Sequence, residues 1–511
     1  MSSSSSGGYS FTAVLADEQA TERLMRDIAA LIEPGDMITL SGDLGAGKTT
    51  FARAFIRHAA GDERIEVPSP TFTLMQTYDL PRFRLLHADL YRLRGEDELA
   101  ELGFEDLREG AVTLLEWPDR AEAALPEDRL DVALTLAPQE GATVRHARVT
   151  GTGRFAARAE RMARIRRFLD GNGFGAAERR RIQGDASTRS YERLARGTEN
   201  IIMMNSPRRT DGPPVRDGKP YSAVAHLAED VTPFIAMARG LTERGFSAPR
   251  ILAAEREAGL LLLEDLGSEL VVEGDPPAPI EERYTAAVDV LAALHAMQLP
   301  ELLPVEPGLD YRLPGYDRDA LSIEAELLLD WYLPKLGAPL SNAAREGFAA
   351  LWSEAFAAIE GAPTTWVLRD YHSPNLLWLS EREGFRRIGL LDFQDAVMGP
   401  AAYDDASPLQ DARVDVPEAL ELALLTRYTR ARREADPYFN MAEFAQLYAT
   451  LAAQRASKIL GIFARLEKRD GKPQYVRHMP RVWAYLRRAL SHPSLSELQR
   501  WYRAHVPALR V

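Results

Sequence analysis

Two groups of residues in this chain have the types and spacing needed to handle phosphate groups. The first reads GDLGAGKT at residues 42–49 and directly follows the apolar run 37–40. A glycine-rich loop between a strand and a helix presents backbone N–H groups and the positive end of the helix dipole to an anion. In this Walker A pattern we expect Lys48 to reach the outer phosphates of ATP and Thr49 to hold Mg²⁺. The other loop residues expected to contact the nucleotide are Gly42, Asp43, Gly45, Ala46, Gly47 and Thr50.

Two acidic residues follow later apolar runs of the same region. Asp89 follows residues 84–88, and Glu116 follows the next such run. Carboxylates at neighbouring strand ends lie on the phosphate side of an α/β sheet, where Asp89 is expected to bind Mg²⁺ and Glu116 to position or activate water. Trp117 is expected to pack over the nucleotide. Each acid alone is equally typical of a helix cap or a surface position, but together with Lys48 they favour an ATPase site.

The second group lies in the C-terminal half of the chain. Residues 366–378 read WVLRDYHSPNLLW, in which Asn375 comes five residues after Asp370. In kinase-like folds this spacing places the aspartate beside the acceptor hydroxyl and the asparagine on Mg²⁺. Asp392 follows the apolar run 388–391, at the position where such folds hold a second metal-binding acid. We therefore expect Asp370 to be the catalytic base and Asn375 and Asp392 to bind the metal.

Elements upstream of this group agree with a kinase-like order. A small-residue turn at residues 184–191 is expected to lie over the phosphates, and an apolar strand follows at 201–204. The run 259–263 then has the character of a hinge strand between a sheet lobe and a helical lobe. The residues expected to contact ATP here are Gly184, Ser187, Arg189 and Glu264.

Composition excludes several classes of protein. The absence of cysteine rules out disulfides and thiol catalysis, and it fits a reducing, cytoplasmic location. A net charge of −13 argues against a surface that grips nucleic acid throughout, so tRNA is expected to be contacted only indirectly. No apolar stretch is long enough for a membrane span. The opening residues 1–8 are polar and are expected to form a disordered tail rather than a signal peptide.

A chain of 511 residues is too long for one hydrophobic core, and its pattern changes near residue 155. Before that point, apolar runs alternate with helical stretches, which indicates an α/β domain at residues 9–155. The rest, residues 156–511, is expected to be an α+β kinase-like domain with a small lobe to about residue 266 and a helical lobe beyond. Six arginines at 154–167 favour a solvated amphipathic helix over an RNA-binding stripe.

Four motifs of the first domain resemble those of the bacterial TsaE family, an ATPase subunit of the machinery that forms threonylcarbamoyladenosine in tRNA. They are GDLGAGKT, SPTFT, HADLYR and LLEWPD. The resemblance implies a P-loop NTPase fold, with ATP hydrolysis that supports a complex of protein subunits. It also implies the same roles for Lys48, Thr49, Asp89, Glu116 and Trp117.

The second domain resembles the aminoglycoside phosphotransferase superfamily. Its motifs GDASTRSY, LLLEDLG, LRDYHSPNLLWL, LDFQDA and GPAAYDDAS are most similar to the anomeric kinases of N-acetylmuramate and N-acetylglucosamine. The resemblance implies a bilobal fold and ATP-dependent phosphorylation of the C1 hydroxyl of an amino sugar in cell-wall recycling. It carries over Asp370 as the base and Asn375 and Asp392 as metal ligands.

Two positions depart from the superfamily pattern. Leu368 stands where a histidine is common, and the strand expected to bear the ATP-binding lysine has none, so phosphate neutralisation is left to Mg²⁺, Arg189 or Arg193. The nearest lysine, Lys219, is expected in a loop. These departures keep two alternatives open for the second domain: a kinase for an aminoglycoside, choline or homoserine, or a non-catalytic nucleotide-binding scaffold that regulates the first domain.

Overall fold

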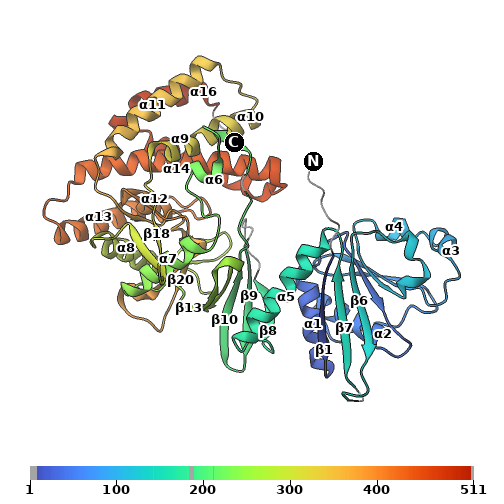
Figure 1. Cartoon of the computed structure of the whole chain (residues 1–511). Helices are drawn as coiled ribbons and strands as arrows, with labels where there is room; N and C mark the ends of the chain where they lie inside the picture. The colour runs from blue at the N-terminus through green and yellow to red at the C-terminus, as the bar shows by residue number, and fades with distance from the viewer. Residues whose placement is uncertain (1–7, 142, 183–188, 211, 508–511) are drawn as a thin grey trace. The chain divides into compact units, whose positions relative to one another are not determined.

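The chain divides into two compact units, and the division cuts two strands. The first unit comprises Met1–Gln183 and Glu192–Glu199, and the second comprises Gly184–Tyr191 and Asn200–Val511, so the boundary cuts β9 (Ser190–Arg196) and separates Glu199 from the rest of β10 (Glu199–Asn205). The computed structural model describes residues 8–141, 143–182, 189–210 and 212–507. Figure 1 shows the elements of each unit.

The first unit is built on a seven-stranded mixed sheet in the order β1-β7-β6-β2-β5-β4-β3. β2 lies between β5 and β6 and is parallel to both, while β3 and β7 pair antiparallel with their neighbours. The strands are β1 (Tyr9–Leu15), β2 (Met37–Ser41), β3 (Met75–Asp79), β4 (Arg84–Asp89), β5 (Val112–Glu116), β6 (Leu130–Leu136) and β7 (Arg145–Gly151). The α/β architecture expected from the alternating pattern is confirmed.

Helices cover both faces of this sheet, which explains why its central strands are apolar on both sides. Leu85 and Leu114 pack in the core beneath α1 and α2, whereas Leu86 and Leu115 pack in a second core with Phe104 of α4. Figure 1 shows α1 and α5 on one side of the sheet and α3 and α4 on the other. The helices are α1 (Glu18–Leu31), α2 (Lys48–Ala60), α3 (Glu96–Glu101), α4 (Phe104–Arg108) and α5 (Phe155–Gly171).

The arginine-rich helix α5 packs on the first unit. Its apolar side buries Phe155, Ala159 and Met162 in the core beneath α1 and α2. On its polar side Arg158 pairs with Asp36, with Nη1 to Oδ2 at 2.5 Å, and Arg166 pairs with Asp27, with Nη2 to Oδ2 at 2.6 Å. The expectation of an amphipathic helix is therefore confirmed. The domain boundary near residue 155 stays a prediction, and the packing of α5 favours a boundary after this helix.

A five-stranded sheet follows in the order β13-β14-β10-β9-β8. β14 pairs antiparallel with both β10 and β13, which places the apolar hinge strand inside the sheet. Beside it the second unit has α7 (Thr232–Glu243), whose Phe234, Ile235 and Met237 enter the core shared with the helical lobe. The strands not yet bounded are β8 (Glu178–Ile182), β13 (Ile251–Glu255) and β14 (Leu260–Glu264).

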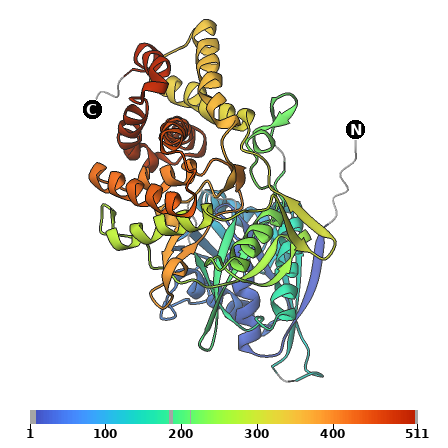
Figure 2. The same ribbon diagram turned by 90° about the vertical axis from the view of Figure 1, so that its left-hand side faces the viewer.

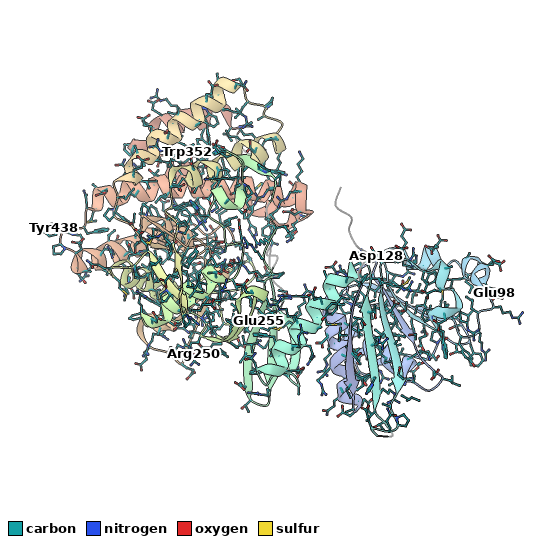
Figure 3. All side chains as sticks on the ribbon, in the orientation of Figure 1. Glu98, Asp128, Arg250, Glu255, Trp352 and Tyr438 are labelled. Carbon is teal, nitrogen blue, oxygen red and sulfur yellow. The ribbon has the colours of Figure 1, made fainter. Side chains whose placement is uncertain are left out.

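The helical lobe surrounds the 30-residue helix α14, which starts after the capping residue Asn440 and ends at the left-handed Gly471. Figure 2 shows the orange and red C-terminal helices gathered in this lobe, and Figure 3 marks Trp352, which is buried, on α11. The longer helices of the lobe are α8 (Glu281–His295), α9 (Arg318–Leu327), α11 (Asn342–Glu360), α12 (Ala402–Leu409), α13 (Glu418–Ala435), α14 (Met441–Asp470), α15 (Met479–Ala489) and α16 (Ser496–His505).

Short two-stranded sheets connect the helices of the second unit. One of them, β19 with β22, carries the segment that leads into the DYHSPN loop, and another, β20 with β21, carries the segment that leads into Asp392. These strands are β19 (Thr365–Val367), β20 (Leu376–Trp378), β21 (Ile388–Leu390) and β22 (Val397–Gly399). No helix within the described part of the chain has the length and apolar character that crossing a membrane requires.

Two candidate phosphate-transfer sites

The glycine-rich loop 42–49 lies between β2 and α2, as its sequence predicts. Gly42 has a φ of +133°, and a Cβ atom there would stand 2.2 Å from the carbonyl oxygen of Leu134. Only glycine fits this position, because the conformation and the close approach both exclude a side chain. The loop therefore has a backbone shaped by contact with β6, and it leads into the N-terminus of α2, which favours an anion.

Lys48 is buried inside this loop. Its Nζ atom donates hydrogen bonds to the carbonyl oxygens of Gly42 at 2.7 Å and Asp43 at 3.0 Å. It also lies 3.5 Å from the centre of the Trp117 ring, a cation–π contact. Burial lowers the pKa of Lys48, and the carboxylates of Glu116 and Asp89 oppose that shift. The ammonium group thus occupies the centre of the loop, where a phosphate would be received.

The two acids of this site lie side by side. Asp89 and Glu116 end neighbouring parallel strands, β4 and β5, in register with each other. Glu116 accepts a hydrogen bond from the Thr49 hydroxyl at 2.9 Å, and Asp89 accepts one from the Thr71 hydroxyl at 2.6 Å. The structure therefore brings together Lys48, Thr49, Asp89, Glu116 and Trp117, five residues singled out by sequence.

The remaining loop residues line the turn in different ways. The carbonyl of Ala46 accepts a hydrogen bond from Arg145 Nε at 2.8 Å, and the backbone N–H of Ala46 donates to Asp43 at 3.1 Å. Gly47 is left-handed and leads directly into α2. Gly45 and Thr50 are exposed. Nucleotide contacts by these residues stay predictions.

One residue of this site was missed from sequence. His87 is fully buried, and its Nε2 lies 3.0 Å from Glu116 Oε1, so Glu116 is held between His87 and Thr49. The available signal was a histidine inside an otherwise apolar strand, in the HADLYR motif.

The DYHSPN segment forms a loop that several buried groups hold in place. Arg369 has a φ of +65°, and its guanidinium forms an ion pair with the buried Glu324. Asp404 on α12 accepts hydrogen bonds from the backbone N–H groups of Leu368 at 2.6 Å and Arg369 at 2.9 Å. Burial raises the pKa of Asp404 to about 7, although both hydrogen bonds favour its ionised form.

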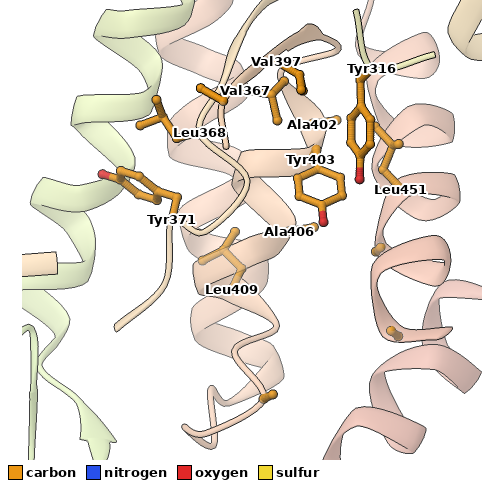
Figure 4. Close-up of a cluster of buried hydrophobic side chains, with 14 of the residues drawn as sticks. Tyr316, Val367, Leu368, Tyr371, Val397, Ala402, Tyr403, Ala406, Leu409 and Leu451 are labelled. Atoms are coloured by element: carbon orange, nitrogen blue, oxygen red, sulfur yellow. The ribbon is translucent and has the colours of Figure 1, made fainter. Parts of the chain in front are cut away.

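Apolar packing supports the same loop from below. Figure 4 shows Leu368 and Tyr371 of the loop segment above Ala406 and Leu409 of α12, beside Tyr403. All of these side chains are buried. The Tyr371 hydroxyl donates to the Ala287 carbonyl of α8 at 2.7 Å, which fixes the chain next to Asp370. Leu368, one of the two departures from the superfamily pattern, is therefore a core residue here.

The three residues expected to carry the chemistry are adjacent. Asn375 Nδ2 donates to the carbonyl oxygen of Asp370 at 2.9 Å, and the carbonyl of Asn375 accepts from the N–H of Leu391 at 3.0 Å. Asp392 therefore follows directly from a strand that is tied to the loop. Burial raises the pKa values of both Asp370 and Asp392, and the negative charge of Asp370 raises that of Asp392 further. Two neighbouring carboxyl groups that repel each other are a good cation site.

A cation is already present beside Asp392. Arg189 Nη1 lies 2.8 Å from Asp392 Oδ1, and the Arg189 side chain is only 7% exposed. Gln394 Nε2 donates to the same carboxylate oxygen at 2.9 Å. Lys219, in contrast, is exposed on the hairpin of β11 (Pro214–Arg216) and β12 (Lys219–Pro220). Arg189 is thus a positive group that pairs directly with Asp392 in the second unit.

Three other residues of this unit were predicted from sequence to contact ATP: Glu264, Gly184 and Ser187. The carboxylate of Glu264, at the end of β14, pairs with Arg250 Nε at 3.1 Å and Arg382 Nη2 at 2.8 Å. Its role in nucleotide binding stays a prediction. Gly184 and Ser187 lie outside the residues that the structure describes.

Taken together, the first unit is a P-loop nucleotide-binding domain and the second has the catalytic loop and acid pair of a kinase-like phosphotransferase. Comparison with family models agrees. Residues 15–145 match the model "Threonylcarbamoyl adenosine biosynthesis protein TsaE", and residues 178–438 match the model "Phosphotransferase enzyme family".

Curated relatives extend this result. The chain is 41% identical over 361 residues to the N-acetylmuramate/N-acetylglucosamine kinase of Caulobacter vibrioides, covering 68% of this chain and 97% of the relative. It is 34% identical to the kinase of that name from Pseudomonas aeruginosa, covering 61% of this chain and 84% of the relative. It is 41% identical over 123 residues to a tRNA threonylcarbamoyladenosine biosynthesis protein TsaE of Rickettsia bellii, covering 24% of this chain and 85% of the relative.

The chain belongs to the TsaE family through its N-terminal part and to the phosphotransferase enzyme family through the rest. It is an enzyme that joins an ATPase-type domain to a phosphotransferase domain, and both families use ATP. The predicted fold classes of both domains are confirmed. The scaffold alternative for the second domain is not favoured.

Proposed function

We propose that this chain is a bifunctional cytoplasmic enzyme. Its first domain binds and hydrolyses ATP in support of a protein complex that forms threonylcarbamoyladenosine in tRNA, touching tRNA only indirectly. Its second domain transfers phosphate from ATP to the C1 hydroxyl of N-acetylmuramate or N-acetylglucosamine. The names of the relatives support the role in tRNA modification and the two sugar acceptors.

In the first domain each polar residue has a role that its contacts support. Lys48 and the amides of residues 42–49 receive the triphosphate, and Glu116 orients the attacking water from between His87 and Thr49. Thr49 and Asp89 supply the oxygen ligands that Mg²⁺ prefers, and the bound ion would neutralise phosphate charge. Trp117, already stacked on Lys48 and 5.1 Å from the Tyr91 ring, closes the site from one side.

In the second domain Asp370 accepts the proton of the sugar C1 hydroxyl as its oxygen attacks the γ-phosphorus of ATP, and ADP leaves. Asn375 and Asp392 present an amide oxygen and a carboxylate, a donor set that fits Mg²⁺. Arg189 stands at the same cluster and takes the place of the missing strand lysine as a phosphate-neutralising group. Gly184, Ser187 and Glu264 remain proposed contacts to the nucleotide.

The observation that carries this proposal is the connected set of Asp370, Asn375 and Asp392. Three backbone or side-chain links fix them: Asn375 to Asp370, Asn375 to Leu391, and Asp404 to the loop that bears Asp370. Such mutual restraint is what a phosphoryl-transfer site needs, because catalysis there depends on positioning and electrostatics.

The decisive experiment is a phosphorylation assay on purified full-length protein with ATP and a panel of acceptors. The panel includes N-acetylmuramate, N-acetylglucosamine, an aminoglycoside, choline and homoserine. We expect a mass increase of one phosphate on the two amino sugars, located at C1 by nuclear magnetic resonance. Turnover of the aminoglycoside, choline or homoserine without turnover of either amino sugar would overturn the assigned acceptor.

A further inference from the structure

The sheet of the first unit has one edge strand that lacks the usual protection against pairing with another chain. β1 ends the strand order, so one side of its backbone has no neighbouring strand among the described residues. Its sequence, YSFTAVL, contains no charged residue and no proline, and its register with β7 runs from Tyr9 to Leu15 without a bulge. The opposite edge strand, β3, is shorter and ends in Asp79. Natural edge strands commonly carry a charge, a proline or a bulge, because an open edge is a template for a further strand.

A groove follows this open strand. Its volume is about 430 Å³, and it is lined by all of residues 11–15 together with residues of α1 and α5. Figure 1 shows β1 at one rim of the sheet, beside α1. Successive side chains of a strand point to opposite faces, so a groove that contacts five consecutive residues follows the backbone and not one face. A groove between an edge strand and a helix is where extended peptides add a strand to a sheet, as in PDZ domains.

The floor of the groove is apolar. Leu15 of β1, Ala20 and Leu24 of α1, and Met162 and Ala163 of α5 all line it, and all five are buried. Every second side chain of an added strand would point to the same face and contact this floor. The groove is therefore suited to a segment with apolar residues at alternate positions.

Three arginines and two aspartates also line the groove, and their pairing is uneven. Arg166 contacts both acids, with Nη2 2.6 Å from Asp27 and Nη1 3.7 Å from Asp170. Asp27 also pairs with an arginine of β8. Arg23 of α1 and Arg167 of α5 make no side-chain hydrogen bond or ion pair with any residue that the structure describes. Both helices that border the groove thus present an uncompensated guanidinium group, for which carboxylates are strong partners.

We propose that this groove binds an extended segment of a partner protein, which adds to the free edge of β1 as an eighth strand of the sheet. The segment has apolar residues at alternate positions and acidic residues that pair with Arg23 and Arg167. Its main-chain hydrogen bonds supply affinity, and its side chains supply specificity. The inference goes beyond the proposed function, because the groove shares no residue with either candidate phosphate site.

The charges of the groove favour this occupant over three others. A second copy of the chain would pair β1 with β1 about a two-fold axis and bring a second Arg23 and a second Arg167 to the same edge. RNA needs a series of cations along its phosphates, whereas this groove has two unpaired ones beside an apolar floor. Residues 1–7 of the chain itself contain no acid. An acidic extended peptide satisfies the open backbone, the apolar floor and both arginines together.

The first experiment selects the occupant without assuming its sequence. A displayed library of random peptides, each longer than the seven residues of β1, is selected on full-length protein. It is counter-selected on full-length Arg23→Glu/Arg167→Glu protein. We expect the enriched peptides to share acidic residues and alternating apolar residues, with no proline between them. Enrichment of basic or proline-rich peptides, or no enrichment, would overturn the inference.

The most enriched peptide is then synthesised with a fluorescent label, and its Kd for the full-length protein is measured by fluorescence anisotropy. Arg23→Glu/Arg167→Glu should raise Kd by at least tenfold. The matched control is Arg64→Glu/Arg84→Glu, which reverses two exposed arginines of the same unit outside the groove and should leave Kd within twofold. Circular dichroism shows whether each variant is folded. An equal rise in Kd for both double variants would indicate non-specific attraction and contradict the inference.

A second measurement leaves the protein unchanged. The backbone N–H groups of a strand alternate between its two edges, and only one edge of an added strand faces β1. N-methylation of every second peptide residue should therefore raise Kd by at least tenfold in one of the two possible patterns and by less than threefold in the other. Equal effects of both patterns would exclude strand pairing.

Two competition measurements test the other macromolecular occupants. We expect the peptide to leave the oligomeric state of the protein unchanged in sedimentation, and we expect tRNA not to displace the labelled peptide. A protein dimer that the peptide dissociates would assign the groove to a second copy of the chain. Displacement by tRNA that is lost in Arg23→Glu/Arg167→Glu would assign it to RNA. Either result would overturn the inference while leaving the proposed function intact.

Discussion

The two phosphate sites of this chain are assembled in opposite ways. In the first unit the cation and the loop that surrounds it come from one continuous segment, in which Lys48 Nζ lies 2.7 Å from the Gly42 carbonyl oxygen. In the second unit the cation Arg189 and the acid Asp392 are 203 residues apart in sequence and 2.8 Å apart in space. One site is defined by local backbone geometry, and the other by side chains that the fold brings together.

The two sites should differ in their sensitivity to substitutions. A site made of backbone amides depends on glycines that allow one loop conformation, as at Gly42. A site made of side chains depends on buried braces, such as the Arg369–Glu324 ion pair and Asp404. The second site should therefore be sensitive to substitutions far from the reacting atoms, and the first much less so.

The largest expected effect separates the two activities. Asp370→Asn removes the proposed base with little change in shape, and kcat for amino-sugar phosphorylation should fall by about 10²–10⁴. ATP hydrolysis by the first domain should be unaffected, because Asp370 belongs to the other unit. Both rates are measured on the same full-length preparation, with ADP release in the absence of sugar as the control. Unchanged phosphotransfer in Asp370→Asn would refute catalysis by this residue.

The reciprocal substitution tests the backbone-built site. Lys48→Ala should abolish sugar-independent ATP hydrolysis, because the loop then lacks its only ammonium group at the position that receives phosphate. Sugar phosphorylation should remain within twofold of the wild type. The measurement is steady-state ADP release with and without N-acetylmuramate. Full retained hydrolysis would show that residues 42–49 are not the ATPase site.

A stability measurement tests where the first domain ends. Met162→Ala in α5 should lower the free energy of unfolding of residues 1–176 by about 2–5 kcal/mol, since Met162 is buried in the core beneath α1 and α2. The exposed Asp170→Ala in the same helix is the control and should change it by less than about 0.5 kcal/mol. Chemical denaturation with guanidinium gives both values. If both variants have the same stability, α5 does not belong to the cooperative core of the first domain.

Much of the first site was predictable because its determinants are local. The apolar strand, the glycines and Lys48 follow one another in sequence, and Asp89 and Glu116 each end an apolar run that forms a strand. His87 was missed because a single histidine in an apolar run is usually a packed core residue, as His295 is, with its Nδ1 2.9 Å from the Tyr428 hydroxyl. Only the pairing of β4 with β5 places His87 against Glu116.

The second site was predictable in its reacting residues but not in its supports. Spacing alone pointed to Asp370, Asn375 and Asp392. The braces Glu324 and Asp411, the latter hydrogen-bonded to Ser373, come from a separate helix and loop, and no local pattern distinguishes them from surface acids. Asp404 lies in the GPAAYDDAS motif, but the motif alone gave it no role. The sequence left the phosphate-neutralising group open among Mg²⁺, Arg189 and Arg193, and it could not separate the two arginines because they are on one short segment. The contact of Arg189 with Asp392 favours the former.

The smallest expected effect concerns the choice between Arg189 and Arg193. Arg189→Gln should raise KM for ATP in the kinase reaction by about tenfold, which corresponds to about 1.4 kcal/mol of lost interaction. Arg189→Lys should raise it less, because a point charge replaces the planar guanidinium but keeps the sign. Arg193→Gln, in the strand β9 that begins directly after Arg189, is the matched control and should leave KM for ATP within twofold. If Arg193→Gln instead gives the larger increase in KM for ATP, the phosphate-neutralising group is Arg193. The ion pair between Arg189 and Asp392 would then not mark the cation that the second site uses.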